Sequence, residues 1–297
     1  MISLAGTHTA LVTPFRDDDA RSIDIEAFDA LVEAQIEGGI AGVVPCGTTG
    51  ESPTLDHVEW QTVVSRAVTV ARKRTRVIAG TGSSSTAHAI EMSRKAEAAG
   101  ADAVMVVVPY YNKPTQAGLV EHYKLVSRAV SCPVIVYNIP GRAGIDLAAE
   151  TLARIAEACP NVVATKEATG NVLRAQEIAC LLGDRMMVLS GDDGLTVPMM
   201  SIGARGVISV TSNLYPREVA TVTSLMDAGK LTEARRAHLA LLPVHAAMFV
   251  ESNPAPVKYA LSWKGRMRHG VRPPLAPLSE EGKKKVVAAC EAFEKGR

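Results

Sequence analysis

Eight short runs of apolar and β-branched residues recur along the chain and constrain its fold more than any other feature. They cover residues 9–13, 42–45, 76–79, 103–108, 134–137, 162–165, 187–189 and 206–210. Each run begins roughly 20–35 residues after the previous one, which is the length of one strand–helix unit. Most runs are apolar throughout rather than alternating, as is typical of strands covered on both faces. The pattern predicts an α/β fold with parallel strands.

Segments with helical periodicity lie between these runs, most with Ser, Thr, Asp or Asn near their start. The predicted helices cover residues 24–37, 56–74, 86–99, 116–130, 148–158, 171–182 and 195–201. Eight such units fit either a closed (β/α)8 barrel or an open doubly wound sheet. We favour the TIM barrel because the units take about 225 residues, close to the usual barrel size of about 250.

The remainder of the 297-residue chain has no strand pattern. Three helices are predicted there, over residues 231–250, 255–263 and 279–293, with a proline-bearing connector before the last. We therefore expect a catalytic barrel over residues 1–227 and a C-terminal helical appendage over residues 228–297.

Charge and cysteine content exclude several classes of protein. The chain has 32 Lys and Arg against 31 Asp and Glu, so it has no strong field for nucleic acid or an anionic membrane. There is no CxxC pair and no apolar run long enough to span a bilayer. We expect a cytoplasmic protein without a disulfide framework or a zinc site. The five scattered cysteines are Cys46, Cys132, Cys159, Cys180 and Cys290.

Lys166 is the most informative polar residue, because barrel enzymes carry their chemistry where strands end. It directly follows the apolar run 162–165. An ammonium group there is costly unless it is partnered or neutralised, and a free amine attacks carbonyl carbons. The alternative is a structural salt bridge to Glu167, although neighbours on a strand point to opposite faces. The position favours a nucleophile.

Other strand ends offer groups that could assist such an amine. The phenol of Tyr137 could relay protons, although a lone boundary tyrosine is more often structural. Thr48 and Thr49 could pass a proton or hold a carboxylate, or could instead cap the next helix. Arg142 could clamp a carboxylate, although a loop arginine is usually only solvated.

Motifs for cofactors are weak or absent. Gly80 and Gly82 form a GxG without the third glycine of a dinucleotide fingerprint. The chain has no HExxH, Walker or GxSxG sequence, and its seven histidines form no close ligand pair. The sequence implies neither a metal nor a nucleotide.

Several stretches, taken in order, carry a resemblance to a known family. They are residues 9–15 (TALVTPF), 46–52 (CGTTGES), 108–115 (VPYYNKPT), 137–142 (YNIPGR), 166–171 (KEATGN), 190–193 (SGDD), 206–211 (GVISVT) and 252–260 (SNPAPVKYA). Together they resemble the dihydrodipicolinate synthase / N-acetylneuraminate lyase family of class I pyruvate aldolases.

The resemblance implies a Schiff base between Lys166 and the keto carbon of pyruvate, with no separate cofactor. A proton relay would consist of Tyr137, Thr48 and Tyr111, the last supplied by a neighbouring subunit of a homo-oligomer, a dimer of dimers. The pyruvate enamine would then attack the aldehyde of a second substrate. The residues implied to hold or line the pyruvate are Thr48, Thr49, Gly191 and Ile208.

The synthase branch of the family is the better match, because Arg142 corresponds to the arginine that holds the carboxylate of aspartate 4-semialdehyde. The product would be 4-hydroxy-tetrahydrodipicolinate, in lysine and diaminopimelate biosynthesis. Ala143 departs from the branch, which usually has Thr or Ser there. The alternatives are another pyruvate-dependent lyase, acting on N-acetylneuraminate or a 2-keto-3-deoxy-sugar acid, and a non-catalytic barrel that senses small carboxylates.

The resemblance also bears on feedback by lysine. Tyr110 and His57 match the pattern of lysine-inhibited members. Trp60 stands where those members often have His, Ser84 where they have Asn, and His88 where they have Glu. Without that carboxylate nothing pairs with the ammonium of lysine, so we expect weak or absent inhibition.

Overall fold

The computed structural model describes residues 3–296 and contains a closed barrel of eight parallel strands in sequence order. The barrel closes between the first and last strands, with His8 opposite Ile208. This closure confirms the TIM barrel over the open sheet. The strands are β1 (Gly6–Ala10), β2 (Gly42–Val44), β3 (Arg76–Gly80), β4 (Ala103–Val107), β5 (Val134–Asn138), β6 (Val162–Glu167), β7 (Met187–Ser190) and β8 (Gly206–Ser209).

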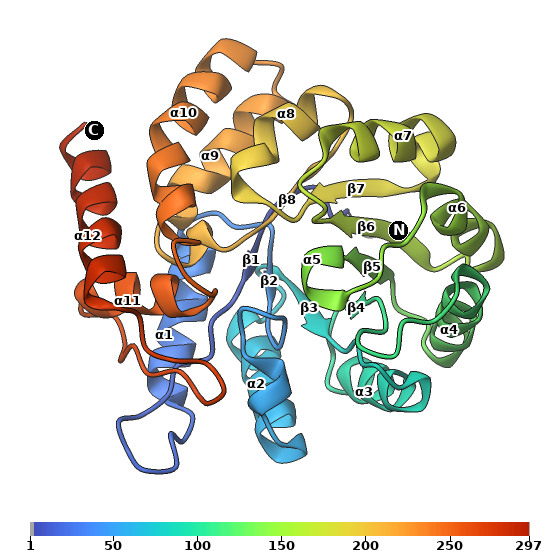
Figure 1. The fold of residues 1–297 in the computed structure, drawn as a ribbon, viewed down its shortest axis with the longest axis horizontal. Helices are drawn as coiled ribbons and strands as arrows, with labels where there is room; N and C mark the ends of the chain where they lie inside the picture. The colour runs from blue at the N-terminus through green and yellow to red at the C-terminus, as the bar shows by residue number, and fades with distance from the viewer. Residues whose placement is uncertain (1–2, 297) are drawn as a thin grey trace.

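Helices surround the barrel and alternate with its strands (Figure 1). The covering helices are α1 (Ile25–Glu37), α2 (His57–Ala71), α3 (Thr86–Ala98), α4 (Gln116–Ala129), α6 (Ala149–Ala158), α7 (Val172–Leu182), α8 (Thr196–Ser201) and α9 (Pro216–Asp227). Short turns of helix follow four strands: η1 (Ser52–Thr54), α5 (Pro140–Ala143), η3 (Asp193–Leu195) and η4 (Thr211–Asn213). A fifth, η2 (Gly183–Arg185), lies between α7 and β7.

Three predicted elements, residues 9–13, 56–74 and 231–250, have boundaries that are wrong by three residues. The first strand begins and ends three residues before the predicted 9–13, because residues 6–9 pair with β8 and the backbone N–H of Val12 already donates to the side chain of Asn213. Helix α2 ends at Ala71 rather than at residue 74, because Arg72 and Lys73 adopt left-handed φ values of 46° and 62°. A helix cannot continue through that conformation.

The core has an inner and an outer layer, both filled mainly by aliphatic side chains. The outer layer packs the strands against the surrounding helices. The inner layer fills the barrel, so the barrel is a packed core with room for chemistry only at its ends. The inner residues are Leu4, Ala10, Val44, Ile78, Ala103, Met105, Ile135, Tyr137, Ala164, Leu189 and Ile208.

The C-terminal part forms the three predicted helices, α10 (Leu231–Ala247), α11 (Ala255–Trp263) and α12 (Glu280–Lys295). Helix α10 ends at Ala247 rather than at residue 250, because the N–H groups of Phe249 and Val250 bond to carbonyls three residues back instead of four. Helix α10 packs against α9 and α12, and α11 packs against α12 and η4, so the group sits on one side of the barrel (Figure 1). Within residues 3–296, no helix is both long enough and apolar enough to cross a bilayer.

Candidate active site

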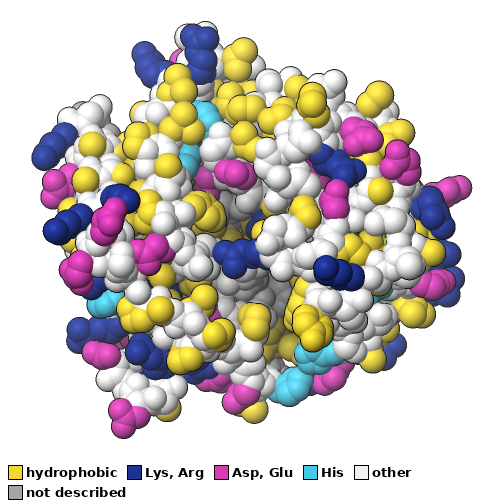
Figure 2. All heavy atoms as spheres, in the orientation of Figure 1, with side chains coloured by type: hydrophobic (Ala, Val, Ile, Leu, Met, Phe, Trp, Pro, Cys, Tyr) yellow, Lys and Arg dark blue, Asp and Glu magenta, His cyan; other side chains and the backbone are white. Residues whose placement is uncertain are grey.

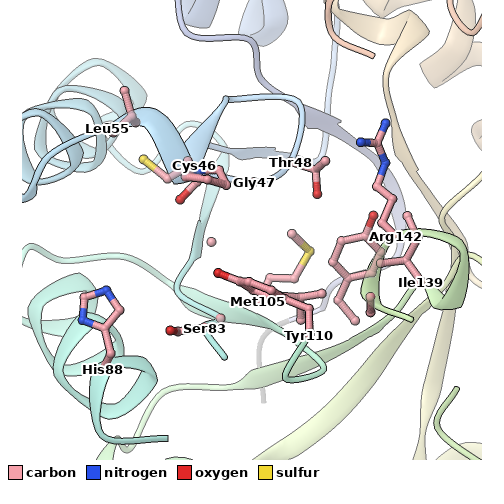
Figure 3. A pocket seen from close by; sticks show the side chains of 17 residues that line it. Cys46, Gly47, Thr48, Leu55, Ser83, His88, Met105, Tyr110, Ile139 and Arg142 are labelled. Carbon is pink, nitrogen blue, oxygen red and sulfur yellow. The ribbon is translucent and has the colours of Figure 1, made fainter. Parts of the chain in front are cut away.

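A pocket of about 470 Å³ opens at the carboxyl ends of β2 to β5. The same face of the molecule is hollowed near its middle (Figure 2). Thr48 and Arg142 lie at one end of this pocket, and Leu55 and His88 lie at the other (Figure 3). The loops after four neighbouring strands therefore share one cavity, as the positions of the polar strand ends predict.

Lys166 and Tyr137 meet at the inner edge of this pocket. The two residues are paired opposite each other in β6 and β5, and Tyr137 lines the pocket. The Lys166 Nζ lies 4.2 Å from the centroid of the Tyr137 ring, and Lys166 is only 5% exposed. A cation over an aromatic face is attracted by the ring quadrupole. The amine and the phenol are thus placed in one buried corner.

The alternative in which Lys166 forms a salt bridge to Glu167 is wrong. Strand β6 runs through Glu167, so the two side chains point to opposite faces. Glu167 instead accepts hydrogen bonds from the backbone N–H of Thr169 at 2.7 Å and from Asn138 at 3.3 Å. Among residues 3–296 the structure shows no ion pair for Lys166.

A polar network fixes the outer face of the same two strand ends. Asn138 donates to Asp146 at 2.8 Å, and Asp146 is paired with Arg174 at 2.6 Å. Burial raises the pKa of Glu167, which lies beside Asn138 in this network. Because Asn138 and Glu167 directly follow Tyr137 and Lys166, the network holds the backbone that carries them.

The two threonines belong to the loop after β2, and neither caps a helix. The cap of α2 is Asp56, whose carboxylate accepts from the N–H groups of Val58 and Glu59 at 2.8 Å. The capping interpretation of the threonines is therefore wrong. Thr48 lines the pocket, whereas Thr49 is buried behind it and accepts a hydrogen bond from Asn253 at 2.9 Å.

Arg142 reaches the pocket from α5, which follows β5. Its guanidinium donates to the backbone carbonyl of Asn253 at 3.5 Å, and Ala143 beside it also lines the pocket. The side chain of Arg142 is thus exposed to the cavity rather than consumed in an ion pair. It remains free to bind a carboxylate.

Besides Lys166 at its edge and Thr49 behind it, three more predicted site residues do not line this pocket within one chain. Tyr111 is 90% exposed and points outward on a loop, with a left-handed φ of 72°. Ile208 lies in the inner layer of the barrel. Gly191 follows β7, where a Cβ atom would come within 2.5 Å of the Ala168 Cβ, so only glycine fits.

Several buried residues lie behind the loop that carries Thr48 and Thr49 (the threonine loop), and the sequence did not predict them. Lys258 Nζ and Glu51 Oε1 form an ion pair at 2.6 Å, and both side chains are fully buried. The backbone N–H of Arg272 donates to the other oxygen of Glu51 at 2.9 Å. A single lysine in the otherwise apolar helix α11 was the signal that could have identified this cluster, because buried charges need partners.

No group of three or more His, Cys, Asp or Glu side chains is placed to hold a metal ion in the described part of the chain. The side chains that converge on the pocket are an amine, a phenol, hydroxyls and a guanidinium. This set can form a covalent adduct with a carbonyl carbon, move protons and bind carboxylates.

Comparison with known proteins agrees with this chemistry. The chain is 57% identical to a 4-hydroxy-tetrahydrodipicolinate synthase of Sorangium cellulosum over 296 residues, which is 100% of the chain and 98% of that protein. The crystal structure of dihydrodipicolinate synthase from Aquifex aeolicus matches with a TM-score of 0.95 and 42% identity, covering 98% of each chain.

A third match is the Acinetobacter baumannii dihydrodipicolinate synthase, whose crystal structure is a complex with pyruvate. It has a TM-score of 0.96 and 41% identity, over 98% of this chain and 99% of that one. The sequence model of the dihydrodipicolinate synthetase family matches residues 3–293, which is almost the whole chain. The chain therefore belongs to the dihydrodipicolinate synthetase family.

Proposed function

We propose that this chain condenses pyruvate with L-aspartate 4-semialdehyde to give 4-hydroxy-tetrahydrodipicolinate, in lysine and diaminopimelate biosynthesis. This is the lyase activity for which its relatives are named. The observation that carries the proposal is the buried amine of Lys166 on the ring of Tyr137, at the edge of a pocket that Thr48 and Arg142 also line.

In the proposed reaction the Lys166 Nζ attacks the keto carbon of pyruvate and water leaves, which forms a Schiff base. Loss of a proton from the methyl group gives an enamine, whose carbon then attacks the aldehyde of the second substrate. The amino group of that substrate then attacks the imine carbon, which closes the ring and releases Lys166 as the free amine. Each step needs proton transfers close to the nitrogen. We assign them to Tyr137 and Thr48 of one chain, together with Tyr111 of the partner subunit.

The carboxylates of the two substrates need separate donors. We assign the pyruvate carboxylate to Thr48 and Thr49, in a site completed by Gly191 and Ile208. Arg142 would hold the carboxylate of the semialdehyde, since a guanidinium can bind a carboxylate with two parallel hydrogen bonds. We further propose a homo-oligomer, a dimer of dimers acting in the cytoplasm. The exposure of Tyr111 supports only that a second chain covers this phenol.

A second candidate is a lyase for another pyruvate-containing acid, such as N-acetylneuraminate or a 2-keto-3-deoxy-sugar acid. It shares the Schiff base, and the small side chain of Ala143 in the pocket wall is the observation that favours it. A panel of both substrate types separates the two. We expect the wild type to condense pyruvate with the semialdehyde, and we expect the rate of this condensation to fall at least tenfold in Arg142→Ala. Cleavage of a sugar acid without condensation would select the second candidate.

Reduction with borohydride in the presence of pyruvate tests the shared step directly. We expect one covalent adduct, found by mass spectrometry on the peptide that contains Lys166. Lys258 is an internal control, because it is also buried but is paired with Glu51 at 2.6 Å. Lys166→Ala should form no adduct and turn over no substrate. An intact protein that gives no adduct at Lys166 would contradict the proposed function.

A further inference from the structure

Asn253 connects the C-terminal region to both carboxylate-binding elements of the pocket. It lies between α10 and α11 and is 5% exposed. Its side-chain Nδ2 donates to the Thr49 Oγ1 at 2.9 Å, across 204 residues of sequence. Its backbone carbonyl accepts from the Arg142 guanidinium at 3.5 Å. One residue thus touches the groups assigned to the two substrate carboxylates.

The direction of the bond to Thr49 determines what that hydroxyl can do. A threonine hydroxyl has one hydrogen to donate and two lone pairs that accept. Because Asn253 donates to the oxygen, the hydroxyl hydrogen is left over, and no hydrogen bond within residues 3–296 uses it. Donation into the oxygen also polarises the hydroxyl and makes it a better donor. A carboxylate can only accept, so such a donor suits it.

The side chain of Asn253 makes no second hydrogen bond with the described residues. Its Oδ1 is buried and receives no hydrogen bond from the described residues. Buried amides normally satisfy both ends, since a buried polar atom without a partner lowers stability. The bond to Thr49 is therefore the hydrogen bond that satisfies this amide among the described residues.

The threonine loop is held a second time from the same region. Two residues after Thr49, Glu51 adopts a left-handed φ of 54°. Such a conformation persists only where surrounding contacts impose it. Here the contacts are Lys258 at 2.6 Å and the backbone N–H of Arg272 at 2.9 Å. The C-terminal region therefore fixes the loop at one point and its hydroxyl at another.

We propose that Asn253 is a positioning residue that keeps the Thr49 hydroxyl pointed at the carboxylate of the bound 2-keto acid and sets its distance from Arg142. This inference rests on the proposed function, because it assumes that Thr49 binds a keto-acid carboxylate. It assigns part of the pyruvate site to a residue outside the eight strand–helix units.

The variant Asn253→Asp tests the direction of the hydrogen bond while keeping the shape of the side chain. A carboxylate would accept the Thr49 hydrogen and bring negative charge towards the substrate. We expect the pyruvate concentration for half-maximal borohydride trapping at Lys166 to rise about a hundredfold or more, as for a lost charge-assisted bond. Asn253→Ala should raise it about tenfold, as for a neutral hydrogen bond.

The matched control is Glu294→Gln, the converse exchange of carboxylate and amide, in α12. It removes the ion pair with Lys264 at 2.6 Å, and we expect trapping to stay unchanged. Wild-type protein without an adduct would overturn the proposed function itself. Wild-type trapping together with an unchanged half-maximal concentration in Asn253→Asp and Asn253→Ala would overturn only the role of Asn253.

A double-mutant cycle separates positioning from general destabilisation and also applies if Asn253→Asp does not fold. If Asn253 acts through Thr49, Asn253→Ala should weaken trapping much less in a Thr49→Val background than in the wild type. Fully additive effects of the two changes would contradict the inference.

Discussion

Two buried lysines in this chain have opposite surroundings. Lys258 is fully buried against Glu51 at 2.6 Å, and burial lowers its pKa to about 8 even though the carboxylate favours the charged form. Lys166 has only the ring of Tyr137 at 4.2 Å as a charge-stabilising contact among the residues described here. Lys258, which has a fixed partner, has a structural role. The lysine without one is available to react.

Lysine inhibition is a second matter that single residues decide. The rings of His57 and His88 stand edge to face at 5.4 Å, and the indole N–H of Trp60 donates to the Gly80 carbonyl at 3.1 Å. These three side chains line a cavity at the His88 end of the pocket, and none of them is a carboxylate. The carboxylate that does line this cavity, Asp56, accepts hydrogen bonds from the N–H groups of Val58 and Glu59 as the cap of α2. His57, Trp60 and His88 therefore add no carboxylate that could pair with an ammonium group.

We therefore expect condensation rates to be unaffected by sub-millimolar lysine at saturating pyruvate. Adding a carboxylate should create sensitivity, so His88→Glu is the complementary variant. The measurement is initial rate against lysine concentration for both proteins. Half-inhibition of the wild type by sub-millimolar lysine would show this interpretation to be incorrect.

At the scale of elements, glycines set how closely the loops at the pocket approach the strands. Gly82 follows β3, and a Cβ atom there would lie 2.3 Å from the backbone nitrogen of Val107 in β4. Real Cβ atoms do not approach backbone so closely, so the loop or the strand would have to move. Gly82 and Val107 both line the pocket, and the movement would change its wall.

Gly82→Ala should accordingly destabilise the protein by about 1–3 kcal/mol, as for an overpacked core position. It should also weaken pyruvate trapping at Lys166. Gly141→Ala is the matched control, because a Cβ atom at that position meets nothing within 4 Å. Denaturant unfolding of the two variants checks the difference. Equal midpoints would rule out the steric argument.

For the molecule as a whole, two buried histidines link stability to pH. Burial lowers the pKa of His8 to about 4 and that of His122 to about 4. Their hydrogen bonds are to the Leu4 carbonyl at 2.7 Å and to the Thr86 hydroxyl at 2.9 Å. Below pH 6.5 the unfolded chain binds protons that the folded chain does not, so stability falls as pH falls from 6.5 towards 4.

Each such histidine lowers the free energy of unfolding by up to about 1.4 kcal/mol for each pH unit that the pH falls within that window. His122→Asn keeps an amide near Thr86 but cannot titrate. We expect its unfolding free energy to fall less steeply than that of the wild type between pH 6.5 and 5, measured by denaturant titration at several pH values. Parallel curves for the two proteins would mean that His122 binds protons equally in the folded and unfolded states, so that burial does not lower its pKa.

The sequence predicted the barrel and most of the pocket because both follow from local patterns. All eight strands and the three C-terminal helices were predicted from apolar periodicity. Lys166 and Tyr137 were found because they lie at strand ends, and Thr48 and Arg142 because they lie in the segments that follow strands. Contacts between distant segments have no such signature. Asn253 and Thr49 are 204 residues apart, and nothing near either one indicates the other.

The division into a barrel of residues 1–227 and a helical region from residue 228 remains our proposal. Helix α9 ends at Asp227 and α10 begins at Leu231, which supports a boundary there. The contacts of Asn253 and Lys258 with the threonine loop nevertheless cross it. The two parts differ in architecture but share one site.

The ion pair between Glu51 and Lys258 has a consequence for how the protein is made. Chains emerge from the ribosome N-terminus first, at about 5–20 residues per second. All eight strands can leave the exit tunnel before Lys258 and Arg272 do. Until then Glu51, in the loop after β2, lacks both of these binding partners. The nascent barrel therefore lacks a finished keto-acid site, and the ability to bind substrate arrives only after Lys258 and Arg272 have emerged.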